Sequence, residues 1–234
     1  AHKLTLLAAL AFGVPINLTA VEVQGIDGID PLDMSFARRL GHEIKLIAQA
    51  RLASNRLLVR VQPTLVPRHS MLAQVRGAMN GIVLQGDLMG SAFLYGSGAG
   101  GRQTSSAVLA DLLELANRPM SGARTGPHNM GFWPRSAAAP AVDIGADYVC
   151  AYYIRVRLDD QAGALAKVSQ VLADADVSVD ALLQDAAKQD LSDLIIMTHP
   201  ISGSQLRAVW PALQAAAGPD HCALVYPVLG DCGC

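Results

Sequence analysis

The order of hydrophobic and polar residues predicts helices and strands through the first half of the chain. Apolar residues at helical spacing predict a helix over residues 4–12. Asp30 followed by Pro31 is typical of a helix start, because the carboxylate caps free N–H groups and proline fits the first turn. Apolar and β-branched runs predict strands at residues 44–50, 57–62, 82–87 and 91–95. This half is therefore expected to combine helices with β-sheet.

A second pattern begins after a segment rich in proline, glycine, alanine and serine. Residues 117–147 carry no hydrophobic periodicity and are expected to form a linker. Beyond them the pattern predicts, in order, a strand at 152–158, a helix at 165–172, strands at 177–183 and 194–198, a helix at 206–213 and a strand at 223–229. This βαββαβ order predicts a ferredoxin-like fold. Pro211 is expected to kink the second of these helices, because proline removes a helix hydrogen bond.

A glycine-rich turn, GSGAGGRQT at residues 96–104, joins the predicted strand at 91–95 to a helical segment. Exposed N–H groups at a helix N-terminus suit a phosphate group, whereas the second interpretation is a tight turn that only lets the helix pack closely on a sheet. The motif alone leaves both interpretations open. A dinucleotide-binding fold is excluded here, because that fold needs an acidic residue about twenty positions on, at the end of a strand. In this chain the helix is followed by the linker.

Composition narrows the function classes. The 234 residues are 51% hydrophobic and 16% charged, so one large or two small domains with a sizeable core are expected. A net charge of −2 without a basic cluster argues against a nucleic-acid partner, and no apolar run reaches the roughly 20 residues that span a membrane. The cysteines form no C-x-x-C pair and the histidines are scattered, which predicts no metal site and reduced thiols in a cytoplasmic protein: Cys150, Cys222, Cys232 and Cys234.

Several stretches share their order and spacing with one enzyme family. They are residues 1–4, 11–13, 24–26, 33, 40–41, 44–46, 61–67, 86–87, 98–100, 104, 107–108 and 111–112. In these stretches residues 1–118 resemble the C-terminal part of the substrate-binding and dimerisation domain of homoserine dehydrogenases. Residues 148–230 resemble an ACT domain, an amino-acid-sensing module, through residues 160–166, 177–179, 184 and 198–199. Residues 119–147 form the linker between the two.

The resemblance implies a mixed β-sheet with helices on one face, followed by the βαββαβ domain. It also implies an NAD- or NADP-dependent oxidoreductase that interconverts L-homoserine and L-aspartate 4-semialdehyde in threonine and methionine biosynthesis. Lys3 falls on the family's catalytic lysine, and the cofactor would be contacted by Gly98, Ala99, Gly100 and Thr104. The family's N-terminal NAD(P)-binding domain is expected to lie before Ala1. The chain is therefore expected to begin in the middle of a helix, and this chain alone is expected to be inactive.

The ACT resemblance implies an amino-acid effector, with threonine expected, bound by Asp160, Gly163 and Gln184. The family's usual proline before the turn glycine is Ala162 here, which puts turn rigidity and effector affinity in question. Asp160 has a second interpretation, as the N-cap of the following helix. A homodimer or homotetramer is expected. Two other hypotheses are a stand-alone ACT-type regulatory protein without catalysis and a purely structural dimerisation module.

Overall fold

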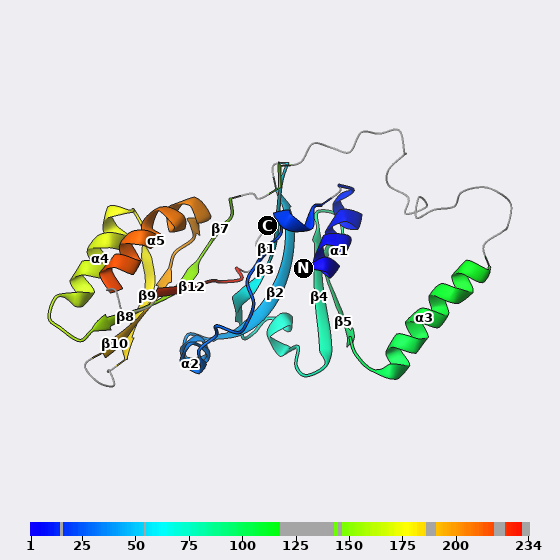
Figure 1. Ribbon diagram of the computed structural model, residues 1–234, viewed down its shortest axis with the longest axis horizontal. Helices are drawn as coiled ribbons and strands as arrows, with labels where there is room; N and C mark the ends of the chain where they lie inside the picture. The colour runs from blue at the N-terminus through cyan, green and yellow to red at the C-terminus, as the bar shows by residue number, and fades with distance from the viewer. Residues whose placement is uncertain are drawn as a thin grey trace. The chain divides into compact units, whose positions relative to one another are not determined.

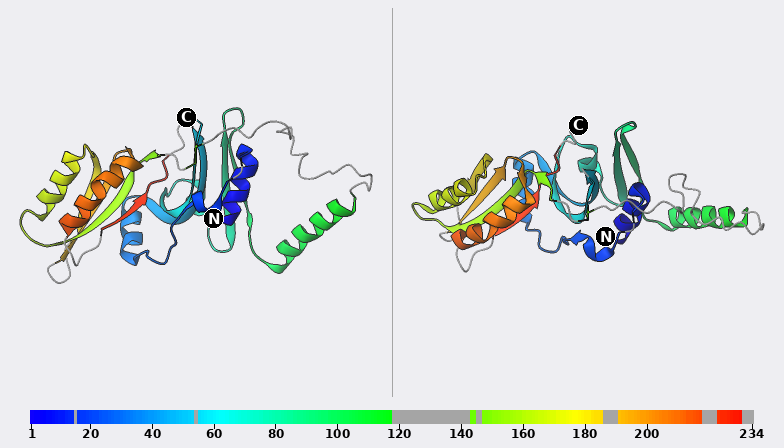
Figure 2. Two further views of the ribbon diagram at one scale, coloured as in Figure 1. Left: turned by 45° about the horizontal axis from the view of Figure 1, so that its top comes forward. Right: turned by 90° about the horizontal axis from the view of Figure 1, so that it is seen from above.

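The protein is described here by a computed structural model that covers residues 1–14, 16–53, 55–117, 143–144, 147–185, 191–217 and 223–230. The chain divides into two compact units, the first made of Ala1–Pro67 with Ala139–Cys234, and the second of Arg68–Ala138. Figure 1 labels the helices and strands, and Figure 2 shows them from two further directions.

In the first unit, a mixed sheet is built around the long strand β3 (Arg56–Pro67). The antiparallel partner β2 (His42–Ala53) pairs along its whole length, from His42 opposite Pro67 to Ala53 opposite Arg56. The short strands β1 (Glu22–Val23) and β6 (Asp143–Ile144) pair with β3 in parallel. Strand β6 lies inside the segment that was predicted to be a linker. The linker prediction was therefore wrong for these two residues. The mixed sheet itself is confirmed.

Helices α1 (His2–Phe12) and α2 (Pro31–Arg39) accompany this sheet, with a 3-10 turn at Leu18–Ala20 between them. Helix α1 ends at Gly13, whose φ of 67° is the left-handed conformation that glycine adopts without strain. Helix α2 starts as predicted, because the Asp30 carboxylate accepts the Leu32 N–H at 2.9 Å and Pro31 holds the first helical position.

The rest of this unit is a βαββαβ module, as predicted. Its elements are β8 (Tyr152–Asp159), α4 (Ala164–Asp174), β9 (Val179–Asp185), β10 (Leu191–Thr198), α5 (Gly203–Ala217) and β12 (Ala223–Pro227). The strands form an antiparallel sheet in the order β12-β8-β10-β9, and a small ladder of β7 (Val149–Cys150) with β11 (Ile201–Ser202) lies beside it. Helix α5 continues through Pro211, the position at which a kink was predicted.

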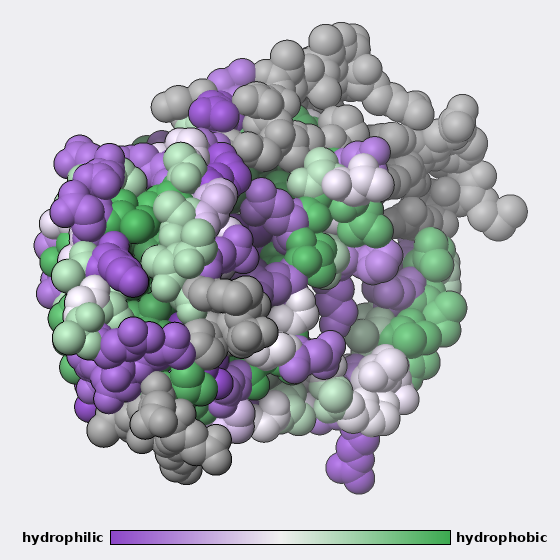
Figure 3. Space-filling model, turned by 60° about the vertical axis from the view of Figure 1, so that its left-hand side comes forward, coloured by the Kyte–Doolittle hydropathy of each residue, from purple (hydrophilic) through white to green (hydrophobic). Residues whose placement is uncertain are grey.

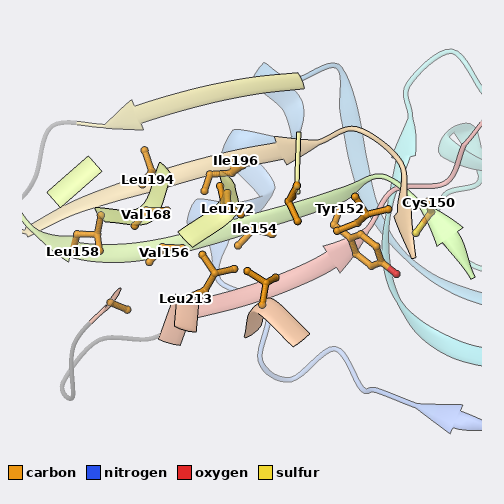
Figure 4. Close-up of a cluster of buried hydrophobic side chains, with 14 residues drawn as sticks. Cys150, Tyr152, Ile154, Val156, Leu158, Val168, Leu172, Leu194, Ile196 and Leu213 are labelled. Carbon is orange, nitrogen blue, oxygen red and sulfur yellow. The ribbon is translucent and has the colours of Figure 1, made fainter. Parts of the chain in front are cut away.

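Each face of the module's sheet is covered by a different part of the unit. Helices α4 and α5 pack on one face over a core that includes Ile154, Val156 and Leu213 (Figures 1 and 4). The other face packs on α2 and β3, where Phe36 and Leu65 meet a group of fully or nearly fully buried side chains: Tyr153, Ile195, Met197, Tyr226 and Val228. The module therefore shares a continuous core with the mixed sheet, and the Leu229 N–H donates to the Leu65 carbonyl at 2.7 Å.

The second unit contains a 3-10 turn at Met71–Gln74, the hairpin β4 (Met79–Gly86) with β5 (Gly90–Ser97), and helix α3 (Gly101–Ala116). Helix α3 carries apolar side chains at helical spacing, but no residue of the helix is buried among the described residues. Its side chains at Val108, Leu112 and Leu115 are each more than half exposed.

Figure 3 shows one face of the molecule, on which hydrophobic residues (green) are interspersed with hydrophilic ones (purple).

Candidate functional site

A pocket of about 150 Å³ lies where strand β8 turns into helix α4. It brings together the three residues predicted to bind an effector. Asp160 follows β8 directly, Gly163 precedes α4, and Gln184 reaches the pocket from β9. The remaining lining residues are Leu158, Asp159, Gln161, Ala164, Leu165, Ser192 and Leu194.

The turn that forms the pocket depends on Gly163. Its φ is 91°, a backbone conformation that is strained for any residue other than glycine. Space is not the reason for glycine here, because a Cβ would meet no atom within 4 Å. The Gln161 N–H bonds the Asp159 carbonyl at 2.9 Å, and the Ala164 N–H bonds the Gln161 carbonyl at 3.1 Å. Gly163 is the N-cap residue of α4 and gives it no side-chain cap, so the alternative interpretation of Asp160 as the N-cap was wrong. The N–H groups in the first turn of α4 therefore receive no side-chain cap, although the Ala164 N–H bonds a backbone carbonyl.

Ser192 was missed by the sequence analysis. It is buried, its hydroxyl accepts a hydrogen bond from the Gln184 amide at 2.9 Å, and it donates to the Asp185 carbonyl at 3.4 Å. The register of the β9–β10 hairpin decides this contact, because Gln184 pairs opposite Leu194 and so lies diagonally across from Ser192. The alternation of Ser192, Leu194 and Ile196 along β10 was the sequence signal that could have found it.

The polar groups of the pocket suit a small zwitterion. Asp159 and Asp160 supply carboxylates that attract an ammonium group, and the uncapped start of α4 supplies N–H groups that attract a carboxylate. Among the described residues no lysine or arginine lines the pocket. Gln184 and Ser192 add amide and hydroxyl groups, which can orient a hydroxyl-bearing side chain.

The glycine turn of the second unit leads from β5 into α3. Gly100 is the N-cap of α3 with a φ of 131°, and a Cβ at this position would meet the end of the Gln103 side chain. A Cβ at Gly98 would meet the Asn80 side-chain amide. No side chain caps α3, and the Thr104 N–H bonds the Gly100 carbonyl at 3.1 Å. The φ of Gly100 disfavours a side chain there, and the start of α3 has no side-chain cap, which fits a phosphate group.

A hollow of about 760 Å³ runs along α3, but all of its lining residues belong to that one helix. It starts at Gly101 and includes none of the four predicted cofactor residues, which are Gly98, Ala99, Gly100 and Thr104. A single helix cannot enclose a ligand, so the hollow does not define a binding site.

Lys3 lies in the first turn of α1 and is exposed. Its neighbour Leu4 is buried against β3, in a cluster with Leu57, Val59 and Val61 that fixes the helix on the sheet. Lys3 belongs to the first unit and Gly100 to the second. The catalytic role of Lys3 therefore stays a prediction.

Comparison with known protein families decides the identity of both parts. The homoserine dehydrogenase family model matches residues 1–113, and the ACT domain model matches residues 152–218. A homoserine dehydrogenase of Neisseria gonorrhoeae is 33% identical over 92% of this chain and 49% of its own length. The chain belongs to the homoserine dehydrogenase family. The resemblance seen in the sequence is thereby confirmed for both parts.

Further relatives agree with this assignment. A homoserine dehydrogenase of Pseudomonas aeruginosa is 34% identical over 93% of the chain and 51% of its own length. A crystal structure of a homoserine dehydrogenase from Thiobacillus denitrificans matches 97% of the chain and 52% of its own, with a TM-score of 0.78 and 33% identity. The chain thus spans about half the length of the curated relatives it matches. Because these relatives match across both parts, a stand-alone ACT regulator is not favoured.

In this homoserine dehydrogenase-family chain, Asp147 holds the start of helix α5. Its carboxylate accepts the Ser204 N–H at 2.9 Å and the Ser204 hydroxyl at 2.6 Å, and Arg207 lies 3.6 Å away. The hydrogen bond from the Ser204 hydroxyl is the largest of the effects that lower the pKa of Asp147 below its usual 3.8. Asp147 therefore caps α5 from outside the helix.

The Asp147 cap predicts a pH-dependent contribution to stability. Because its pKa is lower in the folded than in the unfolded protein, the contribution is complete above pH 3.8 and is lost as the pH falls through the folded value. We expect Asp147→Asn, which removes the charge but keeps the size of the side chain, to lower the free energy of unfolding by about 0.3–1 kcal/mol at pH 7, as is typical of a carboxylate at a helix N-terminus. Thermal melting from pH 7 to pH 3 should show this difference shrinking at the acid end. The exposed Asp180→Asn is the control, and a pH-independent difference would contradict the prediction.

The remaining predictions concern the cysteines, metal sites and membrane spans. Cys150 is a free, buried cysteine, and burial raises the pKa of its thiol; Cys222, Cys232 and Cys234 lie outside the described residues. Within the described part of the chain, no three His, Cys, Asp or Glu side chains gather as a metal site would require. None of the helices described there combines the length and hydrophobicity of a membrane span.

Proposed function

We propose that this chain forms the substrate-side and regulatory part of a cytoplasmic homoserine dehydrogenase, which interconverts L-homoserine and L-aspartate 4-semialdehyde with NAD or NADP. The observation that carries the proposal is the match to homoserine dehydrogenases through both the mixed sheet and the ACT domain. The proposed boundaries are residues 1–118 for the catalytic domain, 119–147 for the linker and 148–230 for the ACT domain. We further propose a homodimer or homotetramer.

Lys3 is the residue we assign to proton transfer. The hydride would be accepted or supplied by bound NAD(P). As negative charge grows on the aldehyde oxygen of the substrate, an ammonium group beside that oxygen stabilises the charge and supplies the proton. Gly98, Ala99, Gly100 and Thr104 would meet the cofactor. The N–H groups of Gly98 and Thr104 already bond the Ala78 and Gly100 carbonyls, so the backbone donors would come from Ala99, Gly100 and the uncapped first turn of α3.

An activity assay tests this proposal. The full-length natural protein that contains this sequence is incubated with L-homoserine and either NAD or NADP, and cofactor reduction is followed by absorbance. We expect homoserine-dependent reduction with at least one cofactor. Purified, folded protein that reduces neither cofactor would contradict the proposed activity.

The pocket between β8, α4 and β9 is the proposed site of an amino-acid effector, and threonine is the effector we favour. The support is the set of groups that meet there: carboxylates for the ammonium, helix N–H groups for the carboxylate, and Gln184 with Ser192 for a hydroxyl. The lining carries small as well as polar side chains. Ala162, directly before Gly163, stands where the family usually has proline.

We expect Gln184→Ala to weaken threonine binding about two- to tenfold, because a hydrogen bond between an amide and a hydroxyl contributes about 0.5–1.5 kcal/mol. Isothermal titration calorimetry of the full chain with L-threonine measures this. Gln170→Ala is the matched control, because Gln170 is an exposed glutamine on α4 whose amide bonds Asp174 at 2.6 Å. Equal affinities of the wild type and Gln184→Ala would exclude Gln184 from the site.

A further inference from the structure

A buried carboxylate of the catalytic part is held entirely by side chains of the ACT domain. Asp33 on α2 has no exposed surface, and its Oδ1 atom accepts hydrogen bonds from Arg155 Nε at 2.7 Å and from the Tyr153 hydroxyl at 2.8 Å. Its Oδ2 atom accepts from Arg155 Nη2 at 3.1 Å. Asp30, the N-cap of α2, lies 3.4 Å from the same Nη2 atom. The first turn of α2 is thus bound to a guanidinium of strand β8.

Arg155 is also bound from inside the ACT domain. Its Nη1 atom donates to Asp193 on the neighbouring strand β10 at 3.2 Å, and the same carboxylate accepts two hydrogen bonds from Arg157, each at 3.0 Å. Burial opposes the charge of Arg155, but hydrogen bonds and charge attraction from Asp33 and Asp193 outweigh it, so the pKa of Arg155 is raised. Asp193 and Asp33 therefore share one permanently charged partner.

Asp193 is the immediate neighbour of a residue of the effector pocket. Ser192 lines that pocket and bonds Gln184, while Asp193 lies with Arg155 on the opposite face of the sheet. The alternation of side chains along a strand causes this arrangement, since successive residues point to opposite faces. The effector pocket and the contact with α2 are consequently separated by the thickness of a single β-sheet.

We propose that the Asp193–Arg155–Asp33 chain transmits occupancy of the effector pocket to helix α2, an inference that rests on the proposed effector site. A ligand that bonds Gln184 and Ser192 competes with the 2.9 Å hydrogen bond between them and shifts the start of β10. The contact of Asp193 with Arg155 is at 3.2 Å, longer than the 2.7 Å contact of Arg155 with Asp33, so it is the more easily altered. The guanidinium then redistributes its hydrogen bonds between Asp193 and the first turn of α2.

Hydrogen–deuterium exchange of the full chain, with and without saturating L-threonine, tests the proposal. In the wild type we expect threonine to change the exchange rate of α2 amides, such as the Leu40 N–H that bonds the Phe36 carbonyl, by at least threefold. In Asp193→Asn, threonine affinity measured by calorimetry should stay within about threefold of the wild type, while the α2 response is lost. Asp193→Glu, which keeps the carboxylate, should restore at least half of the response.

The matched control is Asp185→Asn, which makes the same charge change at the exposed residue paired directly opposite Asp193. It should respond like the wild type. If Asp193→Asn does not fold, which its melting curve reports, Asp193→Ala replaces it and should likewise lose the α2 response while binding is kept. Threonine binding without any change at α2, or an unchanged response in a folded variant that lacks the Asp193 carboxylate, overturns the coupling but leaves the proposed effector site intact. Absence of threonine binding to the wild type overturns both.

Discussion

Asp33→Ala is expected to lower the free energy of unfolding by about 3–5 kcal/mol, because it leaves the buried charge of Arg155 without its closest partner. The Arg155 side chain is 3% exposed and its Nε atom lies 2.7 Å from the Asp33 carboxylate. The same substitution removes the acceptor of the Tyr153 hydroxyl, which is also buried. Urea unfolding of the full chain, followed by circular dichroism, measures the loss.

The exposed Asp27→Ala, in the loop before α2, is the control and should stay within about 0.5 kcal/mol of the wild type. The double variant Asp33→Leu with Arg155→Met removes both charges and should recover part of the loss, since apolar groups of similar size can replace a buried pair. A cost below about 1 kcal/mol for Asp33→Ala would mean that water reaches Arg155, and that the ACT domain is not held on α2 by this pair.

Lys3→Ala in the full-length protein is expected to lower kcat by about 10²- to 10⁴-fold, because a positioned proton donor contributes about that much to a reaction. The KM for homoserine should change far less, since the proton moves only as the reaction proceeds. Stopped-flow and steady-state assays of homoserine-dependent cofactor reduction separate the two. Helix α1 should keep its place in Lys3→Ala, because Leu4 and Ala8 make its buried contacts.

Lys3→Arg distinguishes proton donation from charge alone. A guanidinium keeps the positive charge but does not release its proton near neutral pH, so kcat should stay low. Lys167→Ala, on the exposed side of α4, is the matched control and should leave kcat unchanged. A folded Lys3→Ala protein with near-normal kcat would remove Lys3 from the mechanism.

The local elements could be predicted because their signals lie within a few residues of one another. Asp30 with Pro31 defines the start of α2 through a cap and a fixed φ, both of which act inside one turn. The alternation at 152–158 likewise fixes which side chains of β8 face the helices. The three predicted effector residues meet in one pocket because the β8–α4 turn and strand β9 belong to a fold whose order of elements was already readable.

Contacts between distant residues were decided only by the tertiary structure. Asp33 and Arg155 are 122 positions apart, and neither residue carries a sign of its partner in its own surroundings. Ser192 lies beside Gln184 in the pocket because of the register in which β9 pairs with β10. Strand β6 is defined only by its pairing with β3. The sequence by itself therefore determined the main helices, the longer strands and the family of this protein. Which charges are buried together depended on the packing of the ACT sheet against α2, because burial and long-range pairing arise only when separate elements meet.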